Sequence, residues 1–138
     1  MAKDHLTMRV APETLRGIER EANRTGRPLT TLAGDLLEEG LAMRLYPGIA
    51  YREGAAGRRP ALIGHRIDVH QVVETVREEG GGLERAASYF RVPVGLVRSA
   101  MEYYADHKDA VDQWIARERE YASDAEERWR RGRDPEPR

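Results

Sequence analysis

The first clear pattern along the chain is an alternation of polar and apolar side chains over residues 5–10. In an extended backbone, successive side chains point to opposite faces. The apolar face then holds Leu6, Met8 and Val10, and the polar face holds His5, Thr7 and Arg9. A single strand needs a partner for its backbone N–H and C=O groups, and no second strand follows nearby in the sequence. The pattern therefore predicts a homodimer in which the same strand of two chains pairs.

A helical pattern follows the alternating segment. Pro12 suits the first turn of a helix, and the apolar residues after it recur at three- and four-residue spacing. Gly26 can end a helix in the left-handed conformation, and Pro28 prevents its continuation. These signals predict a helix over residues 12–25.

A second, more apolar helix is predicted after this turn. We expect Thr30 or Thr31 to cap its first turn. Its leucines are Leu32, Leu36, Leu37 and Leu41. Because a segment of about forty residues offers too little core for a stable monomer, these leucines are expected to pack against a second copy.

A further module is predicted over residues 46–107. Two short strand-like pieces, residues 49–51 and 61–63, flank a charged, turn-rich tip at residues 52–59, which favours a β-hairpin. Asp68 is then expected to cap a helix. The buried face of that helix is expected to hold Val69, Val72, Val73 and Val76.

Residues 83–101 predict two short helices with a turn near Arg91, as in a helix-turn-helix unit. The small residues of the first helix allow close packing, and Val92 can fill the turn. The second helix is expected to expose Arg98 and Ser99. Two interpretations are open: these two residues contact DNA bases, or the unit serves as a packing or partner-binding scaffold.

Residues 108–138 are rich in charge and predict a helix that trails into a disordered end at Gly132, Pro135 and Pro137. Trp114 is expected to close the core of the preceding module. Trp129 is expected instead to anchor a protein partner, together with its arginine neighbours Arg128, Arg130, Arg131 and Arg133. A solvated helix with an unstructured tail is the alternative.

Residues 4–45 resemble the ribbon-helix-helix family of bacterial repressors and antitoxins, through T-M-R-V-A-P-E-T-L, the G-R-P turn and the helix that begins T-T-L. In that family the paired strands lie in the DNA major groove. The resemblance implies base contacts from His5, Thr7 and Arg9 and a phosphate contact from Thr30 and Thr31. The chemistry fits independently, because an arginine fork can bind guanine O6 and N7 and threonine can contact a thymine methyl.

Residues 46–114 resemble a family of small bacterial VapB-like antitoxin domains that occur beside toxins with a PIN-like ribonuclease fold. The similarity lies in G-R-R-P-A-L, in residues 64–69 and in A-M-E-Y-Y. The G-T-R-I motif of the family reads G-H-R-I here, with His65 in place of a small hydroxyl residue. The resemblance implies a PIN-like toxin as partner.

Composition adds constraints on these hypotheses. The formal net charge is -1, and residues 1–45 hold seven basic and seven acidic side chains, so any DNA affinity must come from locally placed charge. The absence of cysteine is compatible with a reducing cytosol. Without an apolar signal core or a run of about 18 apolar residues, a soluble cytoplasmic protein is expected.

The sequence offers little support for catalysis. The histidines, at positions 5, 65, 70 and 107, form none of the usual metal-binding spacings. Neither a nucleophile elbow nor a phosphate-binding glycine loop is present. We therefore expect no enzyme activity, no cofactor and no metal site.

The patterns and the two resemblances together predict a mainly α protein with three parts. Residues 1–45 form a ribbon-helix-helix dimer of one strand and two helices, residues 46–107 a hairpin and helix-turn-helix-like module, and residues 108–138 a charged helix with a disordered tail. The predicted function is a type II antitoxin that binds its own promoter DNA as a dimer and neutralises a toxin. The alternative is a stand-alone dimeric transcriptional regulator.

Overall fold

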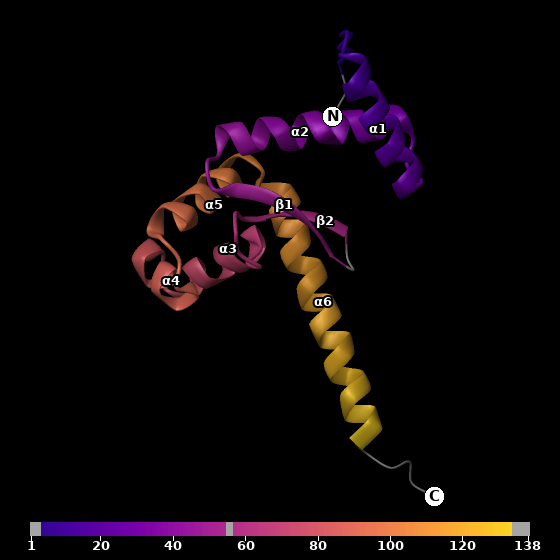
Figure 1. Cartoon of the computed structure of the whole chain (residues 1–138). Helices are drawn as coiled ribbons and strands as arrows, with labels where there is room; N and C mark the ends of the chain where they lie inside the picture. The colour runs from indigo at the N-terminus through magenta and orange to yellow at the C-terminus, as the bar shows by residue number, and fades with distance from the viewer. Residues whose placement is uncertain (1–3, 55–56, 134–138) are drawn as a thin grey trace, which may run out of the picture. The chain divides into compact units, whose positions relative to one another are not determined.

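The computed structural model describes residues 4–54 and 57–133. Over these residues it is mainly helical, with six helices and one two-stranded antiparallel sheet (Figure 1). The chain divides into two compact units, residues 1–41 and 42–138, and the boundary falls within α2. The mainly α fold class is thereby confirmed, and each unit is described by itself.

In the first unit, α1 spans Pro12–Thr25, as predicted. Gly26 ends the helix in the left-handed conformation, with φ of 68°, and its N–H donates to the carbonyl of Ala22. The preceding residues 4–11 form no regular secondary structure in the single chain. The strand expected at residues 5–10 needs a second chain and stays a prediction.

The second helix, α2, spans Leu29–Leu45. The expectation that Thr30 or Thr31 caps it is wrong, because the helix already begins at Leu29. The carbonyl of Pro28 accepts the first hydrogen bond of the helix, from the N–H of Leu32 at 3.0 Å. Both threonines therefore lie inside the first turn.

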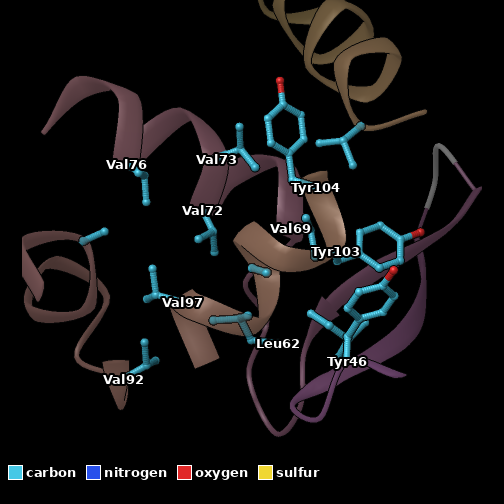
Figure 2. Close-up of a cluster of buried hydrophobic side chains, with 14 of the residues drawn as sticks. Tyr46, Leu62, Val69, Val72, Val73, Val76, Val92, Val97, Tyr103 and Tyr104 are labelled. Carbon is cyan, nitrogen blue, oxygen red and sulfur yellow. The ribbon is translucent and has the colours of Figure 1, made fainter. Parts of the chain in front are cut away.

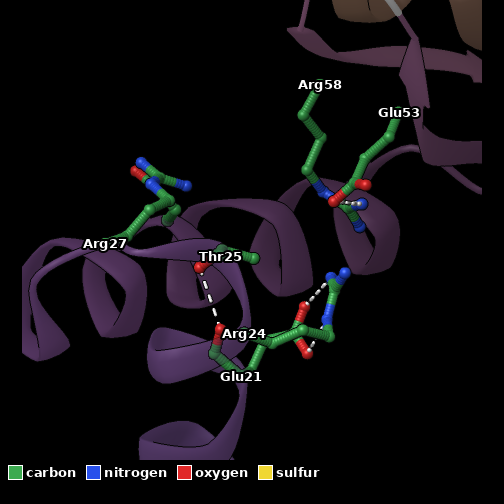
Figure 3. A network of polar contacts seen from close by, with 7 residues as sticks. Glu21, Arg24, Thr25, Arg27, Glu53 and Arg58 are labelled. Carbon is green, nitrogen blue, oxygen red and sulfur yellow. Dashed lines mark hydrogen bonds and ion pairs between the residues drawn. The ribbon is translucent and has the colours of Figure 1, made fainter.

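Polar contacts hold the end of α1 and the turn after it. Arg24 forms an ion pair with Glu21 on the previous turn, and the Thr25 hydroxyl donates to the Glu21 carbonyl at 2.8 Å (Figure 3). Arg27 in the turn forms an ion pair with Asp35 of α2. These contacts lie at the surface and fix local geometry more than they stabilise the fold.

The second unit begins with the predicted hairpin. Strand β1 spans Ile49–Gly54 and pairs antiparallel with β2, Gly57–Leu62. Both strands run further into the expected charged tip than predicted, and the register places Arg52 opposite Arg59. The carboxylate of Asp68, outside the hairpin, pairs with both of these arginines.

Helix α3 spans Val69–Glu78, and Asp68 is its N-cap, as expected. Asp68 forms a capping box with Gln71, in which the Asp68 N–H donates to Gln71 Oε1 at 2.8 Å. All members of the predicted valine stripe are buried: Val69, Val72, Val73 and Val76. The helical period read from the sequence is therefore confirmed.

Helices α4, Leu83–Phe90, and α5, Val94–Asp106, form the two predicted short helices with a turn between them. Arg91 in that turn has a φ of 57°, the left-handed conformation that glycine usually takes. Val92 is buried beside it and fills the turn, as expected. The helix pair therefore keeps its turn although an arginine stands at the strained position.

The core of this unit lies between α3, α5 and the hairpin (Figure 2). Tyr46 and Tyr103 pack edge to face, with ring centroids 5.4 Å apart. The Tyr46 hydroxyl donates to Asp106, and this hydrogen bond, together with burial, raises the pKa of Tyr46 to about 12. The buried hydroxyl group of Tyr46 thus has a hydrogen-bond partner within the unit.

The last helix, α6, spans Lys108–Arg133. Its first turns join the core through Val111 and Ile115, which are buried. Beyond Ile115 every described residue is exposed, and Figure 1 shows this part extending past the other elements of the unit. The helix runs through Gly132, where the sequence predicted its end, and the predicted disordered residues Pro135 and Pro137 lie outside the described residues.

Candidate nucleic-acid interface and partner surface

The predicted base-reading residues are all accessible in the single chain. His5, Thr7 and Arg9 are exposed, and Arg9 is in no ion pair with a described residue. The apolar side chains between them are exposed too, with Leu6 at 72% and Met8 at 55%. Neither face of this segment is therefore covered by the chain that carries it.

The rest of the first unit also has little core. Among residues 4–41 only Ala22 and Leu32 are buried. On α2, large apolar side chains remain in solvent, and they are Leu29, Leu36, Leu37, Leu41, Met43 and Leu45. A helix that is apolar on several sides is normally buried in an assembly.

The predicted phosphate contacts lie in the first turn of α2. Thr30 and Thr31 are exposed there, beside backbone N–H groups that have no partner within a helix, and this turn holds no acidic side chain. Such a turn is chemically suited to an anion.

Of the two DNA contacts predicted in the second module, one residue is exposed and the other is buried. Arg98 on α5 is exposed, but Ser99 is 8% exposed, and its hydroxyl donates to the Pro47 carbonyl. The expectation that Ser99 faces solvent is wrong, because the loop around Gly48 packs against α5. A Cβ at Gly48 would lie 2.7 Å from the side chain of Leu96.

An arginine–carboxylate cluster on the hairpin was not recognised from the sequence. Asp68, which is 2% exposed, accepts hydrogen bonds from Arg52 at 2.6 and 3.1 Å. Arg59 Nε lies 2.7 Å from Asp68 Oδ2, in an ion pair without the alignment of a hydrogen bond. The hydrogen bond to Asp68 raises the pKa of Arg52 above its usual value. The missed signal is the strand register, which puts two arginines directly opposite each other.

Next to this cluster, Trp114 of α6 packs against the second unit at His70, as expected. Its ring stacks on His70, with centroids 6.1 Å apart, and burial lowers the pKa of His70. The guanidinium groups of Arg59 and Arg117 lie 5.9 and 5.3 Å from the Trp114 ring centroid. Trp114 is therefore part of the fold.

A hollow of about 540 Å³ lies on the hairpin, lined by residues 50–53, 61–62 and 64–66. His65, the residue that departs from the G-T-R-I motif, stands exposed at its wall together with Arg66. Arg66 is in no ion pair with a described residue. The hollow is therefore polar and open to water.

Trp129, the predicted anchor, is 59% exposed on the far part of α6, and the Arg133 guanidinium lies 4.6 Å from its ring centroid. Arg130 and Arg131 pair with glutamates one turn earlier, at 2.7 and 2.6 Å. Arg128 is exposed and in no ion pair with a described residue. Of the predicted arginines, Arg133 therefore lies at the tryptophan ring, whereas Arg130 and Arg131 pair with glutamates of the same helix.

Three further findings limit the chemistry. Within residues 4–54 and 57–133, no three His, Asp or Glu side chains gather in a way that could hold a metal ion. In the same ranges, no helix has the length and apolar character needed to cross a membrane. Comparison with family models, curated proteins and solved structures gave no match.

The arginine–carboxylate cluster makes a first prediction. Asp68→Asn leaves two arginines facing each other across the strands, so the free energy of unfolding should fall by about 3–5 kcal/mol. Urea denaturation followed by circular dichroism measures this. As a control, Glu126→Gln breaks an exposed helical ion pair and should cost less than about 1 kcal/mol. Equal stability of the two variants would contradict the central role of Asp68.

Proposed function

We propose that this chain is a type II antitoxin. Residues 5–10 of two chains pair as a ribbon that binds the promoter of its own operon, and the C-terminal helix neutralises a PIN-like ribonuclease toxin. The observation that carries the proposal is the apolar surface that residues 4–45 leave exposed in the single chain.

The energetics support a dimer. Burying one leucine or methionine side chain contributes about 1.5–3 kcal/mol, and α2 alone exposes several of them. The alternating segment adds unpaired backbone groups, which only another strand can satisfy along their length. A second copy supplies both partners at once, because it brings the same segment and the same helix.

The polar face of the segment supports DNA as the ligand. When Leu6, Met8 and Val10 turn inward, Thr7 and Arg9 point outward on a two-stranded ribbon, and such a ribbon fits the major groove. The first turn of α2 offers free N–H groups and two hydroxyls for a phosphate. Since residues 1–45 carry no net charge, these local groups must supply the affinity.

The far part of α6 supports a protein partner. An exposed tryptophan among arginines is typical of a binding hot spot. PIN-like nucleases hold metal with clustered carboxylates, and a guanidinium fork can pair with such carboxylates. Arg128 has no acidic partner among the described residues, so it is available for this contact.

A second candidate is a stand-alone dimeric regulator without a toxin. The hollow on the hairpin favours it, because His65 and Arg66 stand exposed there and offer polar contacts that the toxin proposal does not use. The neighbouring gene distinguishes the two: a small nuclease with clustered carboxylates favours the antitoxin, and its absence favours the regulator.

Met8→Glu tests the dimer. A glutamate on the inward face would bury an unpaired charge in the ribbon and should abolish dimerisation, since such a charge costs several kcal/mol. Sedimentation at micromolar concentration measures the change. The control Thr7→Glu adds the same charge to the outward face and should remain dimeric. A monomeric wild-type chain with a fully folded first unit would refute the dimer.

Arg9→Ala and Thr7→Ala test the reading face. Each should weaken binding to the chain's own promoter, by about 1–3 kcal/mol for Arg9, or roughly 5- to 150-fold in Kd, while the circular dichroism spectrum stays unchanged. Arg85→Ala on α4 changes an exposed arginine outside every predicted contact; it is the control and should bind like wild type. If both ribbon variants bind the promoter normally in fluorescence anisotropy, the ribbon does not read DNA.

Truncation after Tyr121 tests the toxin contact. The shortened chain keeps Val111 and Ile115 and should still dimerise and bind DNA, yet it should fail to protect cells from the toxin of the neighbouring gene. Trp129→Ala should show the same loss in milder form, because it removes only the anchor. Full protection by the truncated chain would end the proposal for this segment.

A further inference from the structure

The turn after β2 presents two polar side chains to the hollow on the hairpin. They are His65 and Arg66, which are both exposed and which neither the ribbon nor the toxin contact uses. Backbone hydrogen bonds fix this turn: the Ile63 N–H donates to the Gly48 carbonyl at 2.8 Å, and the His65 N–H donates to the Leu62 carbonyl at 3.1 Å. Both side chains therefore start from an ordered backbone.

The lining of the hollow also includes Arg52 of β1, whose guanidinium is held in place. Its Nε and Nη2 donate to the two oxygens of Asp68 at 2.6 and 3.1 Å. These bonds do not use Nη1, and the Arg52 side chain is 31% exposed. Arg52 therefore keeps N–H donors for a ligand in a fixed orientation.

The charges around the hollow do not cancel. Arg52 and Arg59 share one carboxylate, that of Asp68, so one positive charge remains. Arg66 adds a second, because it is in no ion pair with a described residue. The acidic side chain of the lining, Glu53, already pairs with an arginine of β2 at 3.6 Å. This excess of positive charge, in a chain whose formal net charge is -1, is suited to an anion.

We propose that the hollow binds a terminal phosphate group, carried by a phosphate monoester or by inorganic phosphate. Such a group has a charge of about −1.5 to −2 at pH 7 and three strong acceptor oxygens. It can accept hydrogen bonds from Arg52, Arg66 and a ring N–H of His65 together. A carboxylate or the phosphodiester of a nucleic-acid backbone carries a single charge, so either would leave one arginine unmatched.

This site has no residue in common with the proposed ribbon or with the toxin contact. It therefore does not rest on the antitoxin proposal, and the two can fail separately. For a stand-alone regulator, the site would define the ligand as a small molecule that ends in a phosphate.

Titration of the full chain with inorganic phosphate and with ribose 5-phosphate, followed by NMR of the backbone amides at constant ionic strength, tests the site. Both probes should give saturable shifts at residues 64–66 in the millimolar range. Arg66→Ala should weaken the binding roughly tenfold or more, because it removes charge-assisted hydrogen bonds. The control Arg85→Ala removes an exposed arginine of α4 and should bind like wild type. Absence of saturable shifts in the wild type, or unchanged affinity of Arg66→Ala, would overturn the proposal.

Two further probes identify the kind of anion. Acetate and dimethyl phosphate, a phosphodiester, each carry one charge and should bind roughly tenfold more weakly than ribose 5-phosphate. Acetate binding with equal affinity would make the site a general anion site and reject phosphate as its ligand. Equal affinity for dimethyl phosphate would assign the hollow to a nucleic-acid backbone and reject the terminal phosphate. Promoter binding by Arg66→Ala should stay at the wild-type level, which separates this site from the proposed ribbon.

Discussion

One buried carboxylate organises the second unit. Asp68 caps α3, bridges to Ala61 at the outer edge of β2, and binds the two arginines that the hairpin register sets opposite each other. Without it, Arg52 and Arg59 would repel across the strands. The Asp68 side chain therefore couples the hairpin to the start of α3. It also holds Arg59, whose guanidinium lies at the Trp114 ring. The packing of the core against these elements depends on the position of Asp68.

The first unit, in contrast, has hardly any buried side chains of its own. It has good helix signals and almost no core of its own, because its apolar residues face outward in the single chain. Fixing the backbone of such a segment costs conformational entropy, and burial of apolar surface in a contact outside the unit would have to offset that cost. The two units therefore differ: the core of the second lies within one chain, whereas the first leaves most of its large apolar side chains in solvent in the single chain.

Local signals allowed most elements to be predicted. The proline and glycine that bound α1, the valine period of α3 and the turn at Arg91 all act within a few residues, so they can be read directly. Long-range contacts could not be read in this way. Ser99 faces a loop about fifty residues earlier, and the arginine cluster needs the strand register. The interfaces stay predictions because the partners that would define them are other molecules.

The division of stability between the units has a consequence for regulation. If the proposed dimerisation folds the first unit, the concentration of dimer rises with the square of the monomer concentration, so the dimeric fraction rises about linearly with total chain at low concentration, and the proposed DNA binding depends on how much chain is present. The core of the second unit, which includes the first turns of α6, is intramolecular and therefore does not depend on concentration. Under the proposed function, the toxin contact needs no dimer, whereas the promoter is occupied only when the chain is abundant. Under the proposed function, these separate folding requirements would let one chain bind a toxin and its promoter in different concentration ranges.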